Sequence, residues 1–251
     1  MAVLVAGALL ATRSQAGERG QNRPGVWWYV PTTAKVVALT FDDGPNPPYT
    51  GQILAALTEA HARATFFVLG RQVVRYPQWV RAEVAAGMEV GNHSWSHENL
   101  RHLSEEAIRQ ELQRTQDAVH AAAGVTPTWM RPPYGAFGPA TVKVNRALGL
   151  SMALWSWTED SRDWANPGPD AIVRRVMGNL QPGDIVLFHD GGGDRSQTVA
   201  ALRIILADLE AQGWRAVTLT ELLAASDTGA SSPGVKISRS TGAWASAPRS
   251  R

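Results

Sequence analysis

Short apolar runs alternate with stretches of helical periodicity along most of this chain. The first run, residues 35–41 (KVVALTF), is rich in β-branched residues and is expected to form a buried strand. Residues 51–61 show the three-to-four spacing of apolar positions that is typical of an amphipathic helix. A second apolar run, residues 64–69 (ATFFVL), predicts another strand. The order strand, helix, strand is typical of a parallel sheet with crossover helices.

The alternation continues along the chain to residue 219. Helical spacing recurs over residues 78–86, and a longer helix is expected from Ser104, which can cap its N-terminus, to Gly124, which can end it. The remaining expected strands are residues 88–92, 128–130, 151–157, 184–188 and 217–219. This pattern predicts an α/β fold: a distorted (β/α) barrel of seven or eight mostly parallel strands, forming a single domain.

Length and composition agree with one large domain. The chain has 251 residues, of which 44% are hydrophobic and 18% charged, so it can bury a sizeable core. The formal net charge is +2, and lysine and arginine are scattered rather than clustered, so nucleic-acid binding is not expected. The absence of cysteine excludes disulfides, thiolate nucleophiles and zinc–thiolate sites.

The two ends of the chain differ from the periodic region between them. Residues 1–34 begin with an apolar run at positions 2–11, which is too short to span a bilayer and suits the core of a secretory signal. The small residues Ser14 and Ala16 would suit cleavage before Gly17, although no basic residue comes before the run. We therefore expect a secreted or cell-envelope protein with no stable membrane span. Residues 226–251 are rich in Ser, Gly, Ala and Pro, which predicts a disordered tail after the folded domain, residues 35–225.

Polar motifs follow the predicted strands at the points where the strands end. Because the C-terminal ends of the strands in such a barrel converge on one face, residues far apart in the sequence are expected to meet there. The chemically active residues at these ends are Asp42, Asp43, His93, His97, Arg131, Asp160, Asp163 and His189. Together they can bind one metal ion and still supply a separate base and acid, which indicates a hydrolase.

The acid and histidine pairs have the spacing of a metal site. Asp42 and Asp43 are neighbours at a strand end, so one can bind a metal while the other faces a substrate. His93 and His97 are four residues apart, which places both imidazoles on one face if the segment makes a helical turn. Two imidazoles and one carboxylate leave open positions on a divalent cation, as in catalytic rather than structural sites.

These motifs carry a resemblance to a known family. Residues 35–225 closely resemble the polysaccharide deacetylases, also called carbohydrate esterase family four. The five matching motifs are TFDDGP at 40–45, His-x3-His at 93–97, RPPY at 131–134, Asp-x2-Asp-Trp at 160–164 and LFH at 187–189. The resemblance implies a metal-dependent hydrolase that removes N-acetyl groups from N-acetylglucosamine residues in peptidoglycan, chitin or chitooligosaccharides.

The resemblance also implies a role for each matching residue. Asp43, His93 and His97 would bind one divalent metal, with zinc favoured and cobalt or nickel as alternatives. Asp42 would be the general base, held ionised and oriented by Arg131. His189 would be the general acid, with a carboxylate that raises its pKa; Asp163 is favoured over Asp160 for this partner. The substrate-binding residues would be Tyr134, whose backbone N–H would stabilise the oxyanion, Trp164 on the sugar and Leu187 on the acetyl methyl.

Other interpretations remain open at this stage. The same metal site would serve an O-deacetylase acting on acetylated xylan, and a carbohydrate-binding barrel without catalysis would keep the fold. The non-catalytic barrel is disfavoured, because a protein that only binds carbohydrate has no chemical need for Asp42, Arg131 and His189 together. Asp160 could instead cap the segment after it. The glycine-rich segment 190–194 lacks the lysine of a phosphate-binding loop and is expected to be a flexible loop. We expect a monomer.

Overall fold

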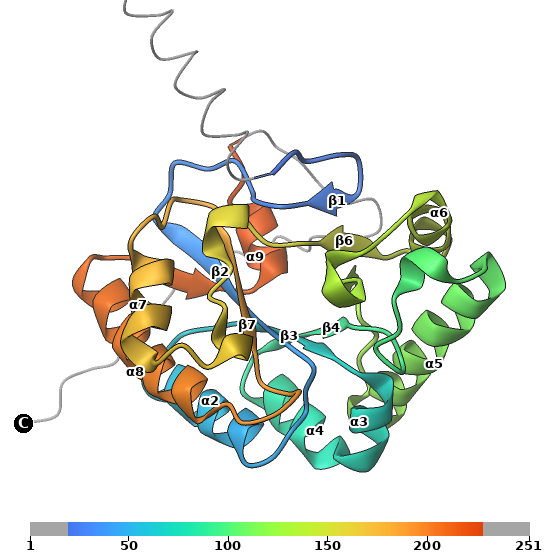
Figure 1. The fold of residues 1–251 in the computed structure, drawn as a ribbon, viewed down its shortest axis with the longest axis horizontal. Helices are drawn as coiled ribbons and strands as arrows, with labels where there is room; N and C mark the ends of the chain where they lie inside the picture. Colours follow the sequence, from blue (N-terminus) through green and yellow to red (C-terminus); the bar gives the residue numbers. More distant parts are fainter. Residues whose placement is uncertain (1–19, 228–251) are drawn as a thin grey trace, which may run out of the picture.

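The computed structural model describes residues 20–227 as one sheet surrounded by helices (Figure 1). The sheet has eight strands in the order β1-β6-β5-β4-β3-β2-β7, with β8 paired to β2, and neighbouring strands are parallel. The strands are β1 (Val26–Trp27), β2 (Val36–Asp42), β3 (Thr65–Val68), β4 (Glu89–Asn92), β5 (Trp129–Met130), β6 (Ser151–Ala153), β7 (Ile185–His189) and β8 (Arg215–Val217). The predicted α/β class, a distorted barrel, is confirmed.

Helices connect most of the strands and cover the outside of the sheet (Figure 1). They are α2 (Tyr49–Glu59), α3 (Gly70–Arg75), α4 (Pro77–Ala85), α5 (Glu105–Ala123), α6 (Pro139–Ala147), α7 (Pro169–Met177), α8 (Ser196–Ala211) and α9 (Leu219–Ala224). Four short 3-10 turns are η1 (Leu100–His102), η2 (Pro133–Gly135), η3 (Trp157–Glu159) and η4 (Asp163–Ala165). Helix α5 begins and ends as predicted, since Ser104 accepts a hydrogen bond from the Ala107 N–H and Gly124 has φ 72°.

The core lies between the sheet and the helices. Every residue of β2 is buried, and Phe41 stacks between Phe66 and Phe188 with ring centroids 5.1 and 5.5 Å apart. Burying each such side chain contributes roughly 1.5–3 kcal/mol relative to leaving it in water. This packing holds the C-terminal ends of β2 and β7 in place. Asp42 is the last residue of β2, and His189 is the last residue of β7.

The gap between the two edges of the sheet is closed by irregular backbone. Tyr29 forms an isolated bridge with Asp184, and Asp160 forms one with Leu187. The Ser156 N–H also donates to the carbonyl of Ile185 at 3.0 Å. The segment after β6 thus runs beside β7 without joining the sheet as a strand, so β6 is shorter than the strand predicted over residues 151–157.

One other predicted strand has different bounds, and one strand was not predicted. The strand predicted at residues 217–219 is β8, which ends at Val217 because Thr218 starts α9 with a capping box to Glu221. Strand β1 was not predicted, since two residues are too few to show alternation.

The predicted leader lies outside the described residues, as does the tail from residue 228 onward. Asp227 is described, and its carboxylate accepts a hydrogen bond from the Thr33 N–H at 2.7 Å. Among the helices of the described residues, none is both long and apolar enough to cross a membrane.

Candidate active site

The C-terminal ends of four strands bring the predicted residues together. Strand β2 ends with Asp42 and leads into Asp43, β4 leads into His93, β5 leads into Arg131, and β7 ends with His189. All of these except Arg131, which is fully buried, line a cavity of about 450 Å³. Its lining residues are Asp42, Asp43, His93, His97, Tyr134, Gly135, Trp155, Asp160, Trp164, Leu187, His189 and Arg195.

Asp43, His93 and His97 form a cluster that fits a divalent cation. The Asp43 Oδ1 atom lies 3.5 Å from His93 Nε2 and 3.2 Å from His97 Nε2. One ligand atom from each residue lies within 4.8 Å of the other two. Asp43 Oδ1 is buried and has no hydrogen-bond partner among the described residues, which is costly unless a cation takes that place. One carboxylate and two imidazoles form a donor set that suits zinc and related metals.

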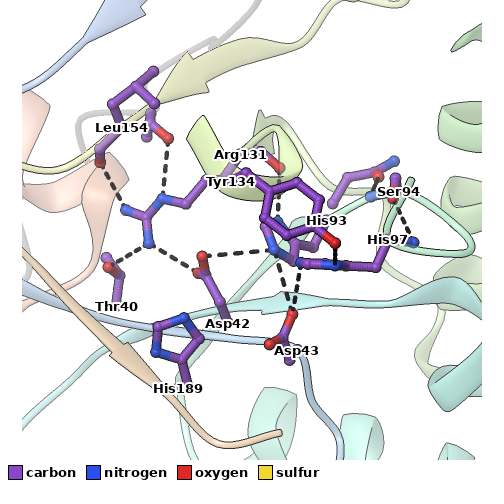
Figure 2. Close-up of polar contacts among 12 residues, drawn as sticks. Thr40, Asp42, Asp43, His93, Ser94, His97, Arg131, Tyr134, Leu154 and His189 are labelled. Carbon is purple, nitrogen blue, oxygen red and sulfur yellow. Dashed lines mark hydrogen bonds and ion pairs between the residues drawn. The ribbon is translucent and has the colours of Figure 1, made fainter. Parts of the chain in front are cut away.

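The other ring nitrogen of each histidine is occupied. His93 Nδ1 donates to the backbone carbonyl of Arg131 at 2.7 Å, and His97 Nδ1 lies 3.2 Å from the hydroxyl of Tyr134 (Figure 2). Burial lowers the pKa of His93 to about 3, so its imidazole is neutral. A neutral ring that donates through Nδ1 leaves the Nε2 lone pair for a metal, the arrangement that orients metal-binding histidines generally.

His93 and His97 do not lie on a helical turn. A helical turn, on which the sequence argument for their common face depended, is therefore not what brings them together. Residues 93–97 form a bend in which Ser94 has φ 69° and His97 has φ 67°. The Ser94 N–H donates to Asn92 Oδ1, and the His97 N–H donates to Ser94 Oγ. Local polar contacts therefore replace helical hydrogen bonds and turn both rings toward Asp43.

Asp42 lies between Arg131 and the metal cluster and is paired with Arg131. Its Oδ1 accepts a hydrogen bond from Arg131 Nη1 at 2.9 Å, and its Oδ2 lies 3.6 Å from His93 Nε2 (Figure 2). Burial raises the pKa of Asp42, and the charge of Arg131 offsets only part of this rise. Arg131 orients the carboxylate as expected, but burial and not Arg131 decides the direction of the pKa. A raised pKa suits a base that must take up a proton.

Arg131 is itself fixed on several sides. It is fully buried, and its Nε and Nη2 donate to the carbonyls of Ala153 and Leu154 at 3.1 and 2.7 Å. Its Nη1 also donates to Thr40 Oγ1 at 2.7 Å, and its guanidinium lies 4.4 Å from the ring centroid of Phe67. The guanidinium therefore has little freedom to move, so the paired Asp42 carboxylate is held in one orientation.

His189 ends β7 beside Asp42 and is paired with Asp163. Its Nδ1 donates to Asp163 Oδ1 at 2.7 Å, its backbone N–H donates to Asp163 Oδ2 at 2.8 Å, and Thr198 Oγ1 donates to the same Oδ2 at 2.9 Å. Burial would lower the pKa of His189, but the hydrogen bond and charge of Asp163 raise it to about 9, helped by Asp42 and Asp43. The imidazole is therefore protonated at neutral pH and can act as an acid.

Asp160 has a different place from Asp163. Its Oδ1 accepts a hydrogen bond from the Arg162 N–H at 2.9 Å, so it caps the turn that follows, and it also lines the cavity. Asp163 is fully buried beside His189. Burial alone would raise the pKa of Asp163, but its hydrogen bonds and the charge of His189 outweigh this effect, so the pKa is lowered. The structure thus pairs Asp163 with His189, a choice between the two acids that the sequence alone does not make.

The predicted substrate-binding residues lie on the walls of the cavity. Leu187 is buried in the wall below His189, whereas Tyr134 and Trp164 are exposed at the rim, with 68% and 55% of their surface in contact with solvent. Tyr134 has φ 61°, a left-handed conformation within η2 that turns its ring onto His97. Its roles on the substrate, the oxyanion contact included, stay predictions.

Sequence reasoning missed three residues of this region. Trp155 and Arg195 line the cavity, and Thr198 holds Asp163. Trp155 lies two residues beyond a short strand and Thr198 lies on a helix, so neither follows a strand end directly. Segment 190–194, expected to be a flexible loop, is packed instead: the Asp190 and Gly191 N–H groups donate to the carbonyl of Asp42 at 3.0 and 3.2 Å.

Comparisons with known proteins agree with this geometry. The family model "Polysaccharide deacetylase" matches residues 29–153. A peptidoglycan-N-acetylglucosamine deacetylase of Bacillus cereus is 45% identical over 198 residues, covering 79% of this chain and 92% of that protein. A chitooligosaccharide deacetylase of Bradyrhizobium sp. is 38% identical, covering 74% of this chain and 90% of that protein. This chain belongs to the polysaccharide deacetylase family, a class of metal-dependent hydrolases.

A solved structure with the same fold shows that membership of the family does not by itself establish catalytic activity. A pseudoenzyme of the same family from Bacillus anthracis matches with a TM-score of 0.75 and 34% identity, covering 82% of this chain and 71% of that one. Membership of the family is therefore compatible with loss of activity. The function of this chain rests on its own base, acid and metal-binding residues.

Proposed function

We propose that this protein is a metal-dependent N-deacetylase that releases acetate from N-acetylglucosamine residues of peptidoglycan, chitin or chitooligosaccharides. The observation that carries the proposal is the arrangement of Asp42 and His189 around one cavity, next to the Asp43, His93 and His97 cluster. A base and a protonated acid beside a metal-binding cluster are the groups that hydrolysis of an amide uses. The relatives named as deacetylases of peptidoglycan and chitooligosaccharides support this choice of substrate.

The base is Asp42. When bound, a divalent cation lowers the pKa of a water and polarises the acetyl carbonyl. Asp42 Oδ2 faces the cluster, 3.6 Å from His93 Nε2, so this oxygen can take the proton of an attacking water. Arg131 keeps the other oxygen occupied, which directs the proton to Oδ2.

The acid is His189. Its Nδ1 is tied to Asp163, so its Nε2 carries the proton that can be given to the leaving nitrogen. An amine leaves poorly unless it is protonated, so an imidazolium with a pKa of about 9 is suited to cleaving an amide near neutral pH. Leu187 supplies an apolar contact for the acetyl methyl, and the exposed ring of Trp164 supplies a flat surface for a sugar.

We propose zinc as the metal, because two imidazoles and one carboxylate with open positions favour it over magnesium or calcium. We further propose that the protein acts outside the cytoplasm as a monomer, with residues 1–34 as leader and lead-in and the tail outside the catalytic domain. The apolar run at positions 2–11 supports export. Mass spectrometry of the mature N-terminus and light scattering test these two points.

Acetate release from three polymers in parallel tests the proposed reaction. Peptidoglycan and chitin oligomers carry N-acetyl groups, whereas acetylated xylan carries O-acetyl groups. We expect acetate from the first two substrates and its loss after treatment with a chelator. Release from xylan alone would replace the proposal with an esterase activity, and release from none would indicate a binding protein.

A further inference from the structure

A buried arginine in the wall of the cavity has no role in the proposed reaction. Arg195 lies just before α8, is 4% exposed, and lines the cavity together with Asp43 and His189. A buried guanidinium normally pairs with a carboxylate, because removing its charge from water costs several kcal/mol. Among residues 20–227, no carboxylate oxygen lies within 4.0 Å of the Arg195 guanidinium.

The hydrogen bonds of Arg195 go to the backbone of the glycine-rich loop. Its Nε donates to the carbonyl of Gly191 at 2.7 Å, and its Nη2 donates to that of Gly192 at 3.2 Å. A longer contact of 3.5 Å joins Nη1 to the carbonyl of Asp194. The planar guanidinium therefore fixes consecutive peptide groups of the loop at once, which a flexible ammonium group cannot do with the same geometry.

The same loop packs directly against Asp43. A Cβ on Gly191 would stand 2.2 Å from the carbonyl oxygen of Asp43 and 2.8 Å from its Cβ. A Cβ on Gly192 would stand 2.9 Å from Asp43 Oδ2 and 3.2 Å from Arg195 Nη2. Both glycines thus allow a close approach that a larger residue would prevent. It follows that Asp43 Oδ2 faces the loop and Arg195, while Oδ1 faces the two histidines.

Asp43 needs such support because its backbone is in an unfavourable conformation. Its φ is 77°, a region that costs a residue with a side chain of order 1–3 kcal/mol unless the surroundings hold it there. The loop holds the backbone of Asp43 from one side, and the Gly191 N–H also donates to the carbonyl of Asp42.

We propose that Arg195 is a positioning residue for the metal ligand Asp43. Through Gly191 and Gly192 it holds the Asp43 carboxylate so that Oδ1 faces His93 and His97. The inference rests on the proposed function only in taking Asp43 as a metal ligand. It requires no particular substrate.

Metal binding to Arg195 variants tests this inference without measuring turnover. Chelated wild-type protein, Arg195→Gln and Arg195→Lys are titrated with Co²⁺ by calorimetry, and the visible spectrum of each saturated protein is recorded. Arg203→Gln is the matched control, because Arg203 lies on the same region of chain, in α8, and pairs with Glu59 on the surface. We expect Arg195→Gln to bind cobalt roughly 10–100-fold more weakly, the usual effect of losing a group that orients a metal ligand.

The spectrum and the lysine variant separate positioning from charge. Arg195→Gln is expected to give a changed cobalt spectrum even at saturation, and Arg195→Lys to remain weakened because it cannot bind both carbonyls as Arg does. If Arg195→Gln does not fold, the titration of Arg195→Lys decides. Unchanged affinity and spectrum, or tighter binding through relief of charge repulsion, would overturn the inference. Wild-type protein that binds cobalt but releases no acetate would contradict the proposed function alone.

Discussion

The adjacent carboxylates Asp42 and Asp43 are given different chemistry by their surroundings. Asp42 is in the last position of a buried strand and pairs with Arg131, whereas Asp43 has a left-handed backbone that turns its Oδ1 toward two imidazoles. A change of backbone conformation between two neighbouring residues thus separates a base from a metal ligand. The same division predicts opposite phenotypes for two very similar substitutions.

Replacing each carboxylate by its amide should show this division. Asp42→Asn is expected to lower kcat on the order of 10²–10⁴-fold, the usual share of a general base, while the bound metal stays near one equivalent. Asp43→Asn is expected to lose metal, because a neutral amide is a poor ligand for zinc. Metal analysis beside steady-state kinetics on an N-acetyl substrate checks both. Equal loss of metal in the two variants would show that the roles are not divided in this way.

His189 should control the alkaline side of the pH–rate profile. As general acid it must be protonated when the C–N bond breaks, so kcat/KM is expected to fall as the pH rises through its pKa of about 9. His189→Ala should remove this alkaline limb and slow an N-acetyl substrate far more than an aryl acetate, whose leaving group needs no proton. Rates on both substrates between pH 5 and 10 provide the measurement. An equal slowing of both would mean that His189 is not the acid.

Among the helices, α4 carries a buried acid that the reaction does not use. Glu83 is fully buried, and neither of its side-chain oxygens has a hydrogen-bond partner among the described residues. Burial raises its pKa well above the ordinary value of 4.5, and the charge of Asp190 raises it further. An acid whose pKa is higher in the folded protein supports folding fully below its ordinary pKa. That support falls as the pH rises toward the folded pKa.

The variant Glu83→Gln should therefore change the pH dependence of stability. The wild-type protein loses stability from this group above pH 4.5, by up to about 1.4 kcal/mol per pH unit, until the folded pKa is reached. Gln does not titrate, so Glu83→Gln should gain on the wild type as the pH rises. Urea denaturation of both proteins at pH 5 and pH 8 measures the difference. A gap that does not widen toward pH 8 would contradict a raised pKa for Glu83.

The same elements show how far the sequence could predict the structure. The strands with β-branched apolar runs and the capped helix α5 were predictable, because burial and capping act over a few neighbouring residues. The predicted site residues are brought together because they follow strand ends, which a parallel barrel gathers on one face. The bend at residues 93–97, the choice of Asp163 over Asp160 and the packing of Gly191 on Asp43 depend on loop backbones, whose conformations leave little trace in periodicity.

In the molecule as a whole, the C-terminal end of the described chain contacts the segment that precedes β2. Asp227 accepts a hydrogen bond from the Thr33 N–H at 2.7 Å, and its own N–H donates to the carbonyl of Pro31 at 3.0 Å. Val30, in the same segment, is buried in the core. The folded unit of this structure thus includes β1 (Val26–Trp27) before the range 35–225 and Asp227 after it.

Truncated proteins should show which terminal residues contribute to stability. Removing residues 1–16, or 228–251, is expected to leave the melting temperature and turnover nearly unchanged, because neither stretch has the periodicity of a packed element. Removing residues 226–251 should lower the melting temperature, because the two hydrogen bonds of Asp227 are lost. Thermal unfolding of the three proteins checks this. A large loss of stability on removing 228–251 alone would show that this segment packs on the barrel.

The central claim is that catalysis depends on one divalent metal held by Asp43, His93 and His97. The most direct measurement is a titration of chelated wild-type protein with zinc, following acetate release from chitin oligomers at each addition. The account predicts almost no acetate from the metal-free protein and a rise that levels off at about one equivalent of zinc. Full activity in protein shown to be metal-free would contradict the account.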